Sequence, residues 1–199
     1  VGHNIGDKTG KHDDLGGVTL FDGSDQQLDY TLVAKENNIS TKDLYFKPTN
    51  LTDSTVTFTA EAAPGKTLVI DYKLGKDYLL HSSLKVNGMA GLFDPNTSKL
   101  NIDWHEKVKE QERGFTFGSR YARLDWKEKD GDTDYLSESS DKEENTEEAV
   151  DWIAFKNQFF SAVMISKDAF DKGADLHSVP YDKKSQENES VRYLKDFTA

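Results

Sequence analysis

The strongest fold signal in this chain is Val150-Asp151-Trp152-Ile153-Ala154-Phe155-Lys156-Asn157-Gln158-Phe159-Phe160-Ser161-Ala162-Val163-Met164-Ile165. Within it, Trp152, Phe155, Phe159 and Val163 recur at the spacing of an amphipathic helix. The segment is also rich in aromatic and β-branched residues, which favour strands. We therefore predict a pair of core strands here, in which Trp152, Phe155, Phe159 and Phe160 are structural residues that pack in the core.

Upstream of this segment, apolar residues alternate with polar ones, which is the period of a strand with one buried face. Pro64-Gly65 lies between two of these runs and predicts a hairpin turn. Another run is closed by Asn87-Gly88. The alternating runs are Leu28–Leu32, Val56–Ala60, Leu68–Tyr72 and Tyr78–Val86.

Two later segments are also predicted as strands. Leu100 to Glu112 is ambiguous, but a helix from His105 to Arg113 would offer one apolar residue to bury, so we favour a strand. Phe115 to Tyr121 again alternates. Seven to nine short strands with turn signals between them, and no convincing long helix, predict an all-β protein of the β-sandwich type.

The chain is expected to have a flexible lead-in at 1–17 and a single domain at 18–199. Its net charge is −11, from 25 basic and 36 acidic residues. Glu128 to Glu148 holds ten acidic residues and two lysines, so this segment alone carries −8. We predict a solvated acidic loop at about 127–148. The tail from Lys167 to Ala199 looks polar, with Tyr181 and Tyr193 as isolated anchors.

The composition argues against several classes of protein. The acidic balance disfavours nucleic acid and anionic membrane surfaces as partners. The chain has no cysteine, which excludes disulfides and thiolate chemistry. No run approaches the ~20 apolar residues that cross a bilayer. Val1-Gly2-His3-Asn4 is not followed by the apolar core of a signal peptide, so we expect a soluble piece excised from, or beginning inside, a longer chain.

The sequence shows no catalytic constellation. Gly118-Ser119-Arg120 lacks the second glycine of a nucleophile elbow. His105-Glu106 lacks the second histidine of a zinc helix. His81 is expected to be a partly buried structural residue. The 36 acidic residues supply many carboxylate pairs for glycosidic cleavage, and none stands out. We predict no catalytic residues and no cofactor.

One acidic pattern suggests calcium without completing the motif. Asp130, Asp132 and Asp134 resemble the start of a calcium-binding loop. Tyr135 stands where that loop needs glycine, and Asp141 stands where it needs a bidentate glutamate. We therefore predict no metal site.

At Trp152 the sequence resembles a known family, the YidC-type (YidC/Oxa/Alb) membrane protein insertases, in which a Trp opens a strand and an aromatic pair follows seven or eight residues later. Arg120-Tyr121-Ala122-Arg123-Leu124, followed by an acidic segment, is similar to the same region of their large periplasmic domain. Asn37-Asn38-Ile39 and Asp43-Leu44-Tyr45-Phe46 also fit. The resemblance spans roughly residues 18 to 170, and the tail after Phe170 departs from it.

The resemblance implies a large twisted β-sandwich, a supersandwich similar to galactose mutarotases but without their catalytic residues. It implies a non-catalytic domain on the periplasmic face of the bacterial inner membrane, in a multi-pass protein whose transmembrane helices lie outside this chain. The implied partners are accessory subunits of the Sec translocon and nascent membrane proteins, bound in a chaperone-like way. The insertase core carries the family's substrate groove, so no groove residue can be assigned here.

Two other hypotheses stay open at this point. A carbohydrate-binding or mutarotase-like sandwich would need a carboxylate base and histidines in one cleft, for which His81 and His105 are the candidates. A surface lipoprotein or adhesion module would need a lipidated cysteine upstream.

Overall fold

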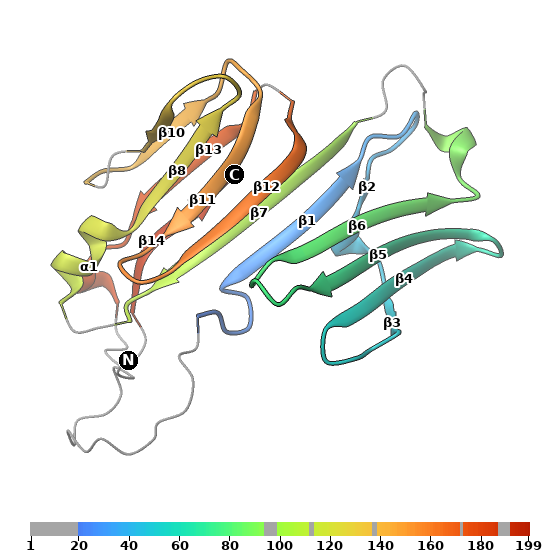
Figure 1. The fold of residues 1–199 in the computed structure, drawn as a ribbon, viewed down its shortest axis with the longest axis horizontal. Coiled ribbons are helices and arrows are strands. Elements are labelled where there is room, and N and C mark those ends of the chain that lie inside the picture. The colour runs from blue at the N-terminus through green and yellow to red at the C-terminus, as the bar shows by residue number, and fades with distance from the viewer. Residues whose placement is uncertain (1–19, 94–98, 112–113, 137–138, 172, 187–191) are drawn as a thin grey trace. The chain divides into compact units, whose positions relative to one another are not determined.

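The computed structural model describes residues 20–93, 99–111, 114–136, 139–171, 173–186 and 192–199 (Figure 1). Strands dominate these residues, and the prediction of an all-β protein with little helix is confirmed. The strands are β1 (Gln26–Leu32), β2 (Ile39–Ser40), β3 (Lys47–Thr49), β4 (Thr55–Ala63), β5 (Lys66–Leu74), β6 (Leu80–Asn87), β7 (Leu100–Lys109), β8 (Arg123–Glu128), β9 (Thr133–Tyr135), β10 (Lys142–Asn145), β11 (Val150–Lys156), β12 (Ser161–Phe170), β13 (Asp175–Pro180) and β14 (Tyr193–Thr198). The helices are α1 (Phe115–Tyr121) and the short 3-10 helices η1 (Thr41–Asp43), η2 (Ala90–Leu92) and η3 (Lys183–Ser185).

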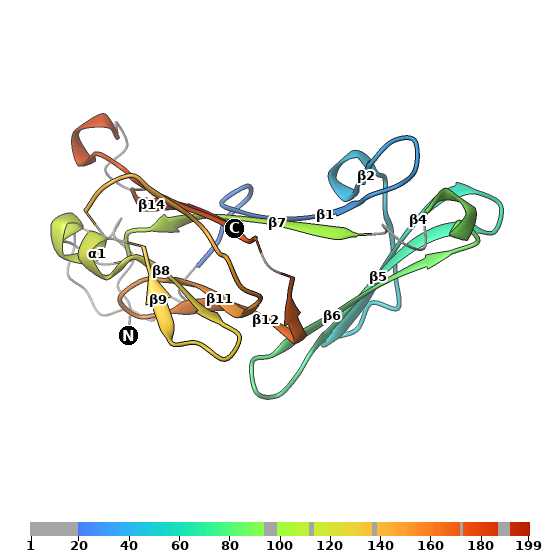
Figure 2. The ribbon, with the colours of Figure 1, turned by 90° about the horizontal axis from the view of Figure 1, so that it is seen from above.

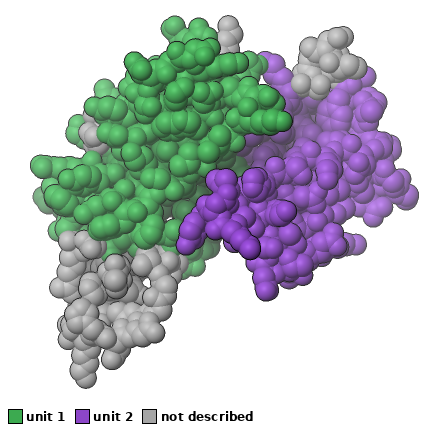
Figure 3. Space-filling model, viewed as in Figure 1, with its two compact units in different colours: residues 1–28, 103–199 green, residues 29–102 purple. Residues whose placement is uncertain are grey.

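The chain divides into two compact units (Figure 3). Unit 1 holds residues 1–28 and 103–199, and unit 2 holds residues 29–102. Each unit has its own hydrophobic core. Residues 29–102 contain eight acidic and eight basic side chains, so unit 2 is neutral and unit 1 carries the whole net charge of −11.

Unit 1 is a sandwich of two antiparallel sheets. One layer has the order β10-β13-β14-β7, continuing to β1 and β2, and the other has the order β12-β11-β8-β9. Figure 2 shows β7 and β14 in one layer and β8, β9 and β11 in the other. Aromatic rings from both layers meet in the core, because Phe155 of β11 stacks on Trp104 of β7 at 3.8 Å and lies 5.3 Å from Phe197 of β14. The predicted β-sandwich is thereby confirmed.

Residues 150–165 form two paired strands, as predicted. β11 and β12 run antiparallel, with Phe155 opposite Ala162. The turn is closed by Asn157, whose Oδ1 accepts hydrogen bonds from the N–H groups of Phe159 and Phe160, each at 2.8 Å. The expectation that both phenylalanines pack in the core is wrong, since they are 48% and 38% exposed. They lie in the turn, where the strand period that buries Phe155 no longer applies.

Residues 115–121 are helical, and the strand prediction for them is wrong. Gly114 has φ +129°, a conformation that favours glycine, and its carbonyl accepts hydrogen bonds from Phe117 and Gly118. Phe115 is then buried, while Phe117 and Tyr121 pack on each other at 4.9 Å. Positions 117 and 121 fit both periods, because four residues equal one helical turn and two strand repeats.

The acidic segment at 127–148 is not one loop, which corrects that prediction. β9 pairs with β8, and β10 pairs with β13. All seven side chains of β9 and β10 are exposed, whereas Leu136 and Thr146 are buried. The run of acidic residues correctly indicated that these side chains are exposed. It gave no signal that their backbone pairs with other strands.

The C-terminal segment belongs to the core of unit 1, although its sequence looked polar. β14 lies between β13 and β7 in its sheet. Leu176, Leu194 and Phe197 are at most 2% exposed. All three side chains belong to the core cluster of unit 1, so a few large apolar residues were enough to make these central strands.

Unit 2 is built on the sheet β3-β4-β5-β6. The predicted turn at Pro64-Gly65 joins β4 and β5, with Gly65 at φ +74°. Gly88 follows β6 at φ +67°, and a Cβ there would lie 2.1 Å from the Gly65 carbonyl oxygen, so this close approach requires glycine. The core of the unit gathers around Leu32, Ala60, Leu68 and Met89.

Candidate apolar binding pocket

A pocket of about 220 Å³ opens beside the core of unit 2. Its floor consists of core side chains from β1, β4 and β5, and its walls come from the segments around η1 and η2. The lining residues are Leu32, Ile39, Asp43, Leu44, Tyr45, Ala60, Glu61, Ala62, Leu68, Met89 and Phe93. Sites for drug-sized ligands measure about 300–1,000 Å³. This smaller pocket therefore suits one or two side chains of a longer ligand.

Tyr45 gives the rim of the pocket an exposed aromatic ring. The residue is 97% exposed, although it follows the partly buried Leu44. A tyrosine with a free ring can cover an incoming apolar side chain while its hydroxyl stays in water. The position thus combines apolar contact area with contact to solvent.

Asp29 of β1 holds residues 40–42, the segment that leads to Leu44 and Tyr45 at the rim of the pocket. The Asp29 carboxylate accepts hydrogen bonds from Ser40 Oγ at 2.5 Å, from the Lys42 N–H at 2.8 Å and from the Thr41 hydroxyl. Burial raises the pKa of Asp29, but these hydrogen bonds outweigh burial and hold the pKa below its ordinary value. Because the ionised carboxylate fixes residues 40–42, it also positions Leu44 and Tyr45.

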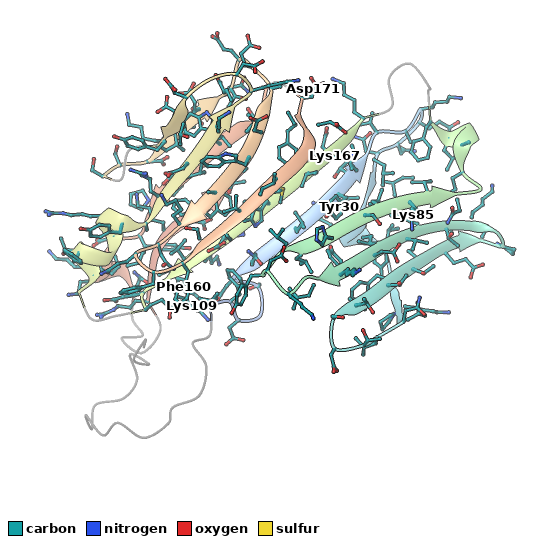
Figure 4. All side chains as sticks on the ribbon, viewed as in Figure 1. Tyr30, Lys85, Lys109, Phe160, Lys167 and Asp171 are labelled. Atoms are coloured by element: carbon teal, nitrogen blue, oxygen red, sulfur yellow. The ribbon has the colours of Figure 1, made fainter. Side chains whose placement is uncertain are left out.

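The opposite wall is held by hydrogen bonds from the backbone and the side chain of Lys35. The Lys35 N–H donates to the Leu92 carbonyl at 3.0 Å, and Lys35 Nζ donates to the Gly91 carbonyl at 3.2 Å. These bonds fix η2, which lies between Met89 and Phe93. The walls are therefore held in place without a ligand. Elsewhere in unit 2, the hydroxyl of Tyr30 lies 3.2 Å from Ser82 Oγ and joins β1 to β6 (Figure 4).

The lining of the pocket is mostly apolar. Two carboxylates, Asp43 and Glu61, stand among apolar side chains. The pocket can accept apolar side chains and favours positive charge beside them.

The histidines named from the sequence lie elsewhere. His81 is exposed on β6 of unit 2, which corrects the expectation of a partly buried residue. His105 lies on β7 of unit 1, where its Nε2 contacts the Asp196 carboxylate. Neither histidine lines this pocket or the smaller one in unit 1. Over the described parts of the chain, no three His, Asp or Glu side chains are grouped to hold a metal ion.

The aromatic segment at 150–165 contributes to a second pocket, which lies in unit 1. Phe159 lines a pocket of about 70 Å³ in unit 1, together with Phe117 and Lys109. Lys109 and Phe160 both lie at this end of unit 1 (Figure 4). Trp152 is half-buried on β11, and Phe155 is buried. The small volume leaves little room for a ligand side chain.

Sequence reasoning missed the residues that form the unit 2 pocket. Tyr45 and Met89 are far apart in sequence and lie outside the strand-like alternation. The available signal was Leu44-Tyr45-Phe46, three consecutive large apolar residues, which one strand face cannot bury together.

Comparison with known proteins identifies relatives of this chain. The family model described as the YidC periplasmic domain matches residues 8–198. The chain is 41% identical over 183 residues to the membrane protein insertase YidC of Phocaeicola vulgatus, covering 92% of this chain and 28% of that protein. It is 37% identical to the same protein of Bacteroides fragilis, with the same coverage, and 32% identical to that of Parabacteroides distasonis, covering 77% of this chain and 25% of that protein.

The chain spans about a quarter of the length of the curated relatives it matches. No solved structure gave a significant match. Among the described residues, no helix is long and apolar enough to cross a membrane.

Proposed function

This chain belongs to the YidC periplasmic domain family, and on that premise we propose that it binds apolar segments of nascent membrane proteins in the pocket of unit 2. The domain acts without catalysis, on the periplasmic face of the bacterial inner membrane, as part of a multi-pass insertase. It holds an extended segment before the membrane-embedded part takes it. The observation that carries the proposal is the preformed apolar pocket with Tyr45 exposed at its rim.

The pocket has the properties that transient binding requires. Apolar lining gives affinity without demanding a particular sequence, because burial energy depends on area. A volume that takes one or two side chains keeps affinity low, so the ligand can be released to the next site. The carboxylates of Asp43 and Glu61 favour ligands in which Lys or Arg flanks the apolar residues.

A peptide-binding measurement tests the proposal. A fluorescent peptide of alternating Leu and Ala residues flanked by lysines is titrated with the chain and followed by anisotropy. Tyr45→Ser and Ala62→Trp, the second of which fills the mouth of the pocket, are each expected to weaken binding about tenfold, the effect of losing one well-buried apolar contact. Both replaced residues are exposed, so the fold is expected to tolerate the changes.

The matched control is Tyr78→Ser. Tyr78 is 96% exposed in the same unit but does not line the pocket. It should leave the Kd for the peptide unchanged. Equal weakening by Tyr45→Ser and Tyr78→Ser, or no weakening by Tyr45→Ser and Ala62→Trp, would show that the peptide binds elsewhere.

Contact with an accessory subunit of the Sec translocon is a second candidate function, which one observation favours. β12 is an edge strand of its sheet, and its Val163 and Ile165 are 48% and 63% exposed. An edge strand with exposed apolar side chains suits the addition of a strand from a partner. This contact would use unit 1.

A further inference from the structure

Two loops of unit 2 lie at the same end of its sheet (Figure 1). One loop joins β3 to β4 and the other joins β5 to β6, and the N–H of Leu74 donates to the Ser54 carbonyl at 2.7 Å. Five large apolar side chains are exposed at this end, and we call them the apolar tip. They are Leu51 (77% exposed), Leu74 (48%), Tyr78 (96%), Leu79 (47%) and Leu80 (60%).

The apolar tip is not part of the pocket or of the core. None of its five residues lines the pocket of unit 2, and none belongs to that unit's core cluster. Single exposed leucines are common on protein surfaces, but a group of large apolar side chains at one place marks an interaction site. The tip therefore needs a partner that can take up apolar side chains from two loops at once.

Part of the backbone of both loops is hydrogen-bonded. The Gly75 N–H donates to the Leu79 carbonyl at 2.7 Å, and the Thr52 N–H donates to the Thr55 carbonyl at 2.9 Å. The Leu79 N–H is taken by Asp77 Oδ1 at 3.3 Å. These bonds lower the cost of moving this part of the loop backbone into a less polar medium.

Tyr78 occupies a backbone conformation that tyrosine rarely adopts. Its φ is +63°, in the left-handed region where glycine is favoured. A bulky aromatic residue in this conformation lowers the stability of the fold. The conformation also sets where the side chain of Tyr78 lies. Tyrosine is one of the two residue types that concentrate where a bilayer meets water, because its ring is apolar and its hydroxyl is polar.

Charge is balanced around the tip. The two loops and the end of β5 carry two lysines, Lys73 and Lys76, and two aspartates, Asp53 and Asp77, and all of unit 2 is neutral while unit 1 carries −11. An anionic bilayer surface would therefore repel unit 1 but not this end of unit 2.

We propose that the apolar tip docks the domain on the lipid bilayer by inserting Leu51, Tyr78, Leu79 and Leu80 into the headgroup region. The occupant is a lipid surface, because loop-borne leucines and a tyrosine without a lining pocket suit a fluid interface that needs no matching shape. The relatives of the chain are named membrane protein insertases, so a bilayer is at hand. Apolar insertion into neutral surroundings depends little on salt or on anionic lipid.

The absence of cysteine from the chain permits a direct test. Single-cysteine variants Tyr78→Cys, Leu51→Cys and Tyr45→Cys each receive one environment-sensitive fluorophore without background labelling. Vesicles of phosphatidylcholine, with or without phosphatidylglycerol, are then added. The fluorophores at 78 and 51 are expected to brighten and shift to the blue with both vesicle types. The fluorophore at 45, an equally exposed tyrosine position away from the tip, is expected to show no change.

A charge variant gives the second readout. Leu80→Glu should lower the partition coefficient into vesicles about tenfold or more, since burial of one leucine is worth a factor of that order. Leu92→Glu, a 44% exposed leucine elsewhere in unit 2, should leave partitioning unchanged. Circular dichroism checks that both variants keep their strands.

Three results would overturn the proposal. The first is an absent response at both 78 and 51, and the second is an equal response at 45. The third is a response that grows with protein concentration when no vesicles are present, which would assign the tip to a protein contact between copies of the chain. Peptide binding by the pocket is measured without lipid, so failure of the lipid-docking proposal would leave the proposed function untouched.

Discussion

Phe155→Ala is expected to lower the free energy of unfolding of unit 1 by about 3–5 kcal/mol, the range for removing a buried phenylalanine. Phe155 is 1% exposed and lies between Trp104, at 3.8 Å, and Phe197, at 5.3 Å. Alanine would remove the ring that joins the two layers of the sandwich and leave a cavity that rigid strands cannot close. Urea denaturation measures the effect, and Trp fluorescence assigns it to unit 1, which holds all three tryptophans.

Phe160→Ala is the matched control, since it makes the same change in the same aromatic segment. Phe160 is 38% exposed in the turn after β11, so its loss should cost about 1 kcal/mol or less. Similar losses for the two variants would contradict the division of this segment into a buried strand and an exposed turn.

The stability of unit 1 is expected to fall as the pH rises from about 5 to above 7, because of Glu106. Burial raises the pKa of Glu106 to about 7 from 4.5, although the hydrogen bond from Gln26 Nε2, at 3.3 Å, favours the charged form. In this pH window the unfolded chain ionises Glu106 while the fold keeps it protonated. The fold therefore binds more protons, and stability is lost until the folded group also ionises near pH 7. The loss amounts to roughly 3 kcal/mol.

Glu106→Gln removes this titration and keeps the size of the side chain. Between pH 5 and pH 8, the free energy of unfolding should change less in the variant than in the unaltered chain. Urea denaturation at each pH measures both. Asp25 does not confound the result, because its pKa lies below the ordinary value and its contribution is lost only in more acidic solution. An unchanged pH profile in Glu106→Gln would refute the assignment to Glu106.

Much of the fold of this chain follows from the period of its apolar residues. The β4–β5 hairpin around Pro64-Gly65, the strand β7 and the β11–β12 pair were all predicted, because each has alternation or β-branched enrichment within one short window. The helix at 115–121 was missed since Phe117 and Tyr121 fit both periods. Strands β9 and β10 were missed because exposed acidic side chains hide backbone pairing with distant strands.

The binding surfaces were harder to predict than the strands. The pocket combines Tyr45 with Met89 and Phe93, which only the tertiary fold brings to one place. The apolar tip combines Leu51 with Tyr78 through pairing of β4 and β5. The strongest family resemblance came from Trp152 to Ala162, and these residues mostly build the fold. The weaker match at Asp43-Leu44-Tyr45-Phe46 includes residues that line the pocket.

The two most exposed tyrosines of unit 2 have different proposed roles. Tyr45 stands at the rim of the pocket and Tyr78 at the apolar tip, at 97% and 96% exposure. Peptide binding and vesicle binding should therefore be lost independently. The same comparison separates both roles from a partner contact at the β12 edge, where Val163 is exposed.

Site-specific photo-crosslinking in the full-length insertase tests most directly whether the pocket receives nascent membrane proteins. A photoreactive amino acid replaces Tyr45 in one variant, Tyr78 in a second and Val163 in a third, and each is irradiated while a membrane protein is being inserted. Crosslinks to the nascent chain from position 45, but not from positions 78 and 163, are the predicted result. Nascent-chain crosslinks that are absent at position 45, or equally strong at all three positions, would contradict a substrate-binding role for the pocket.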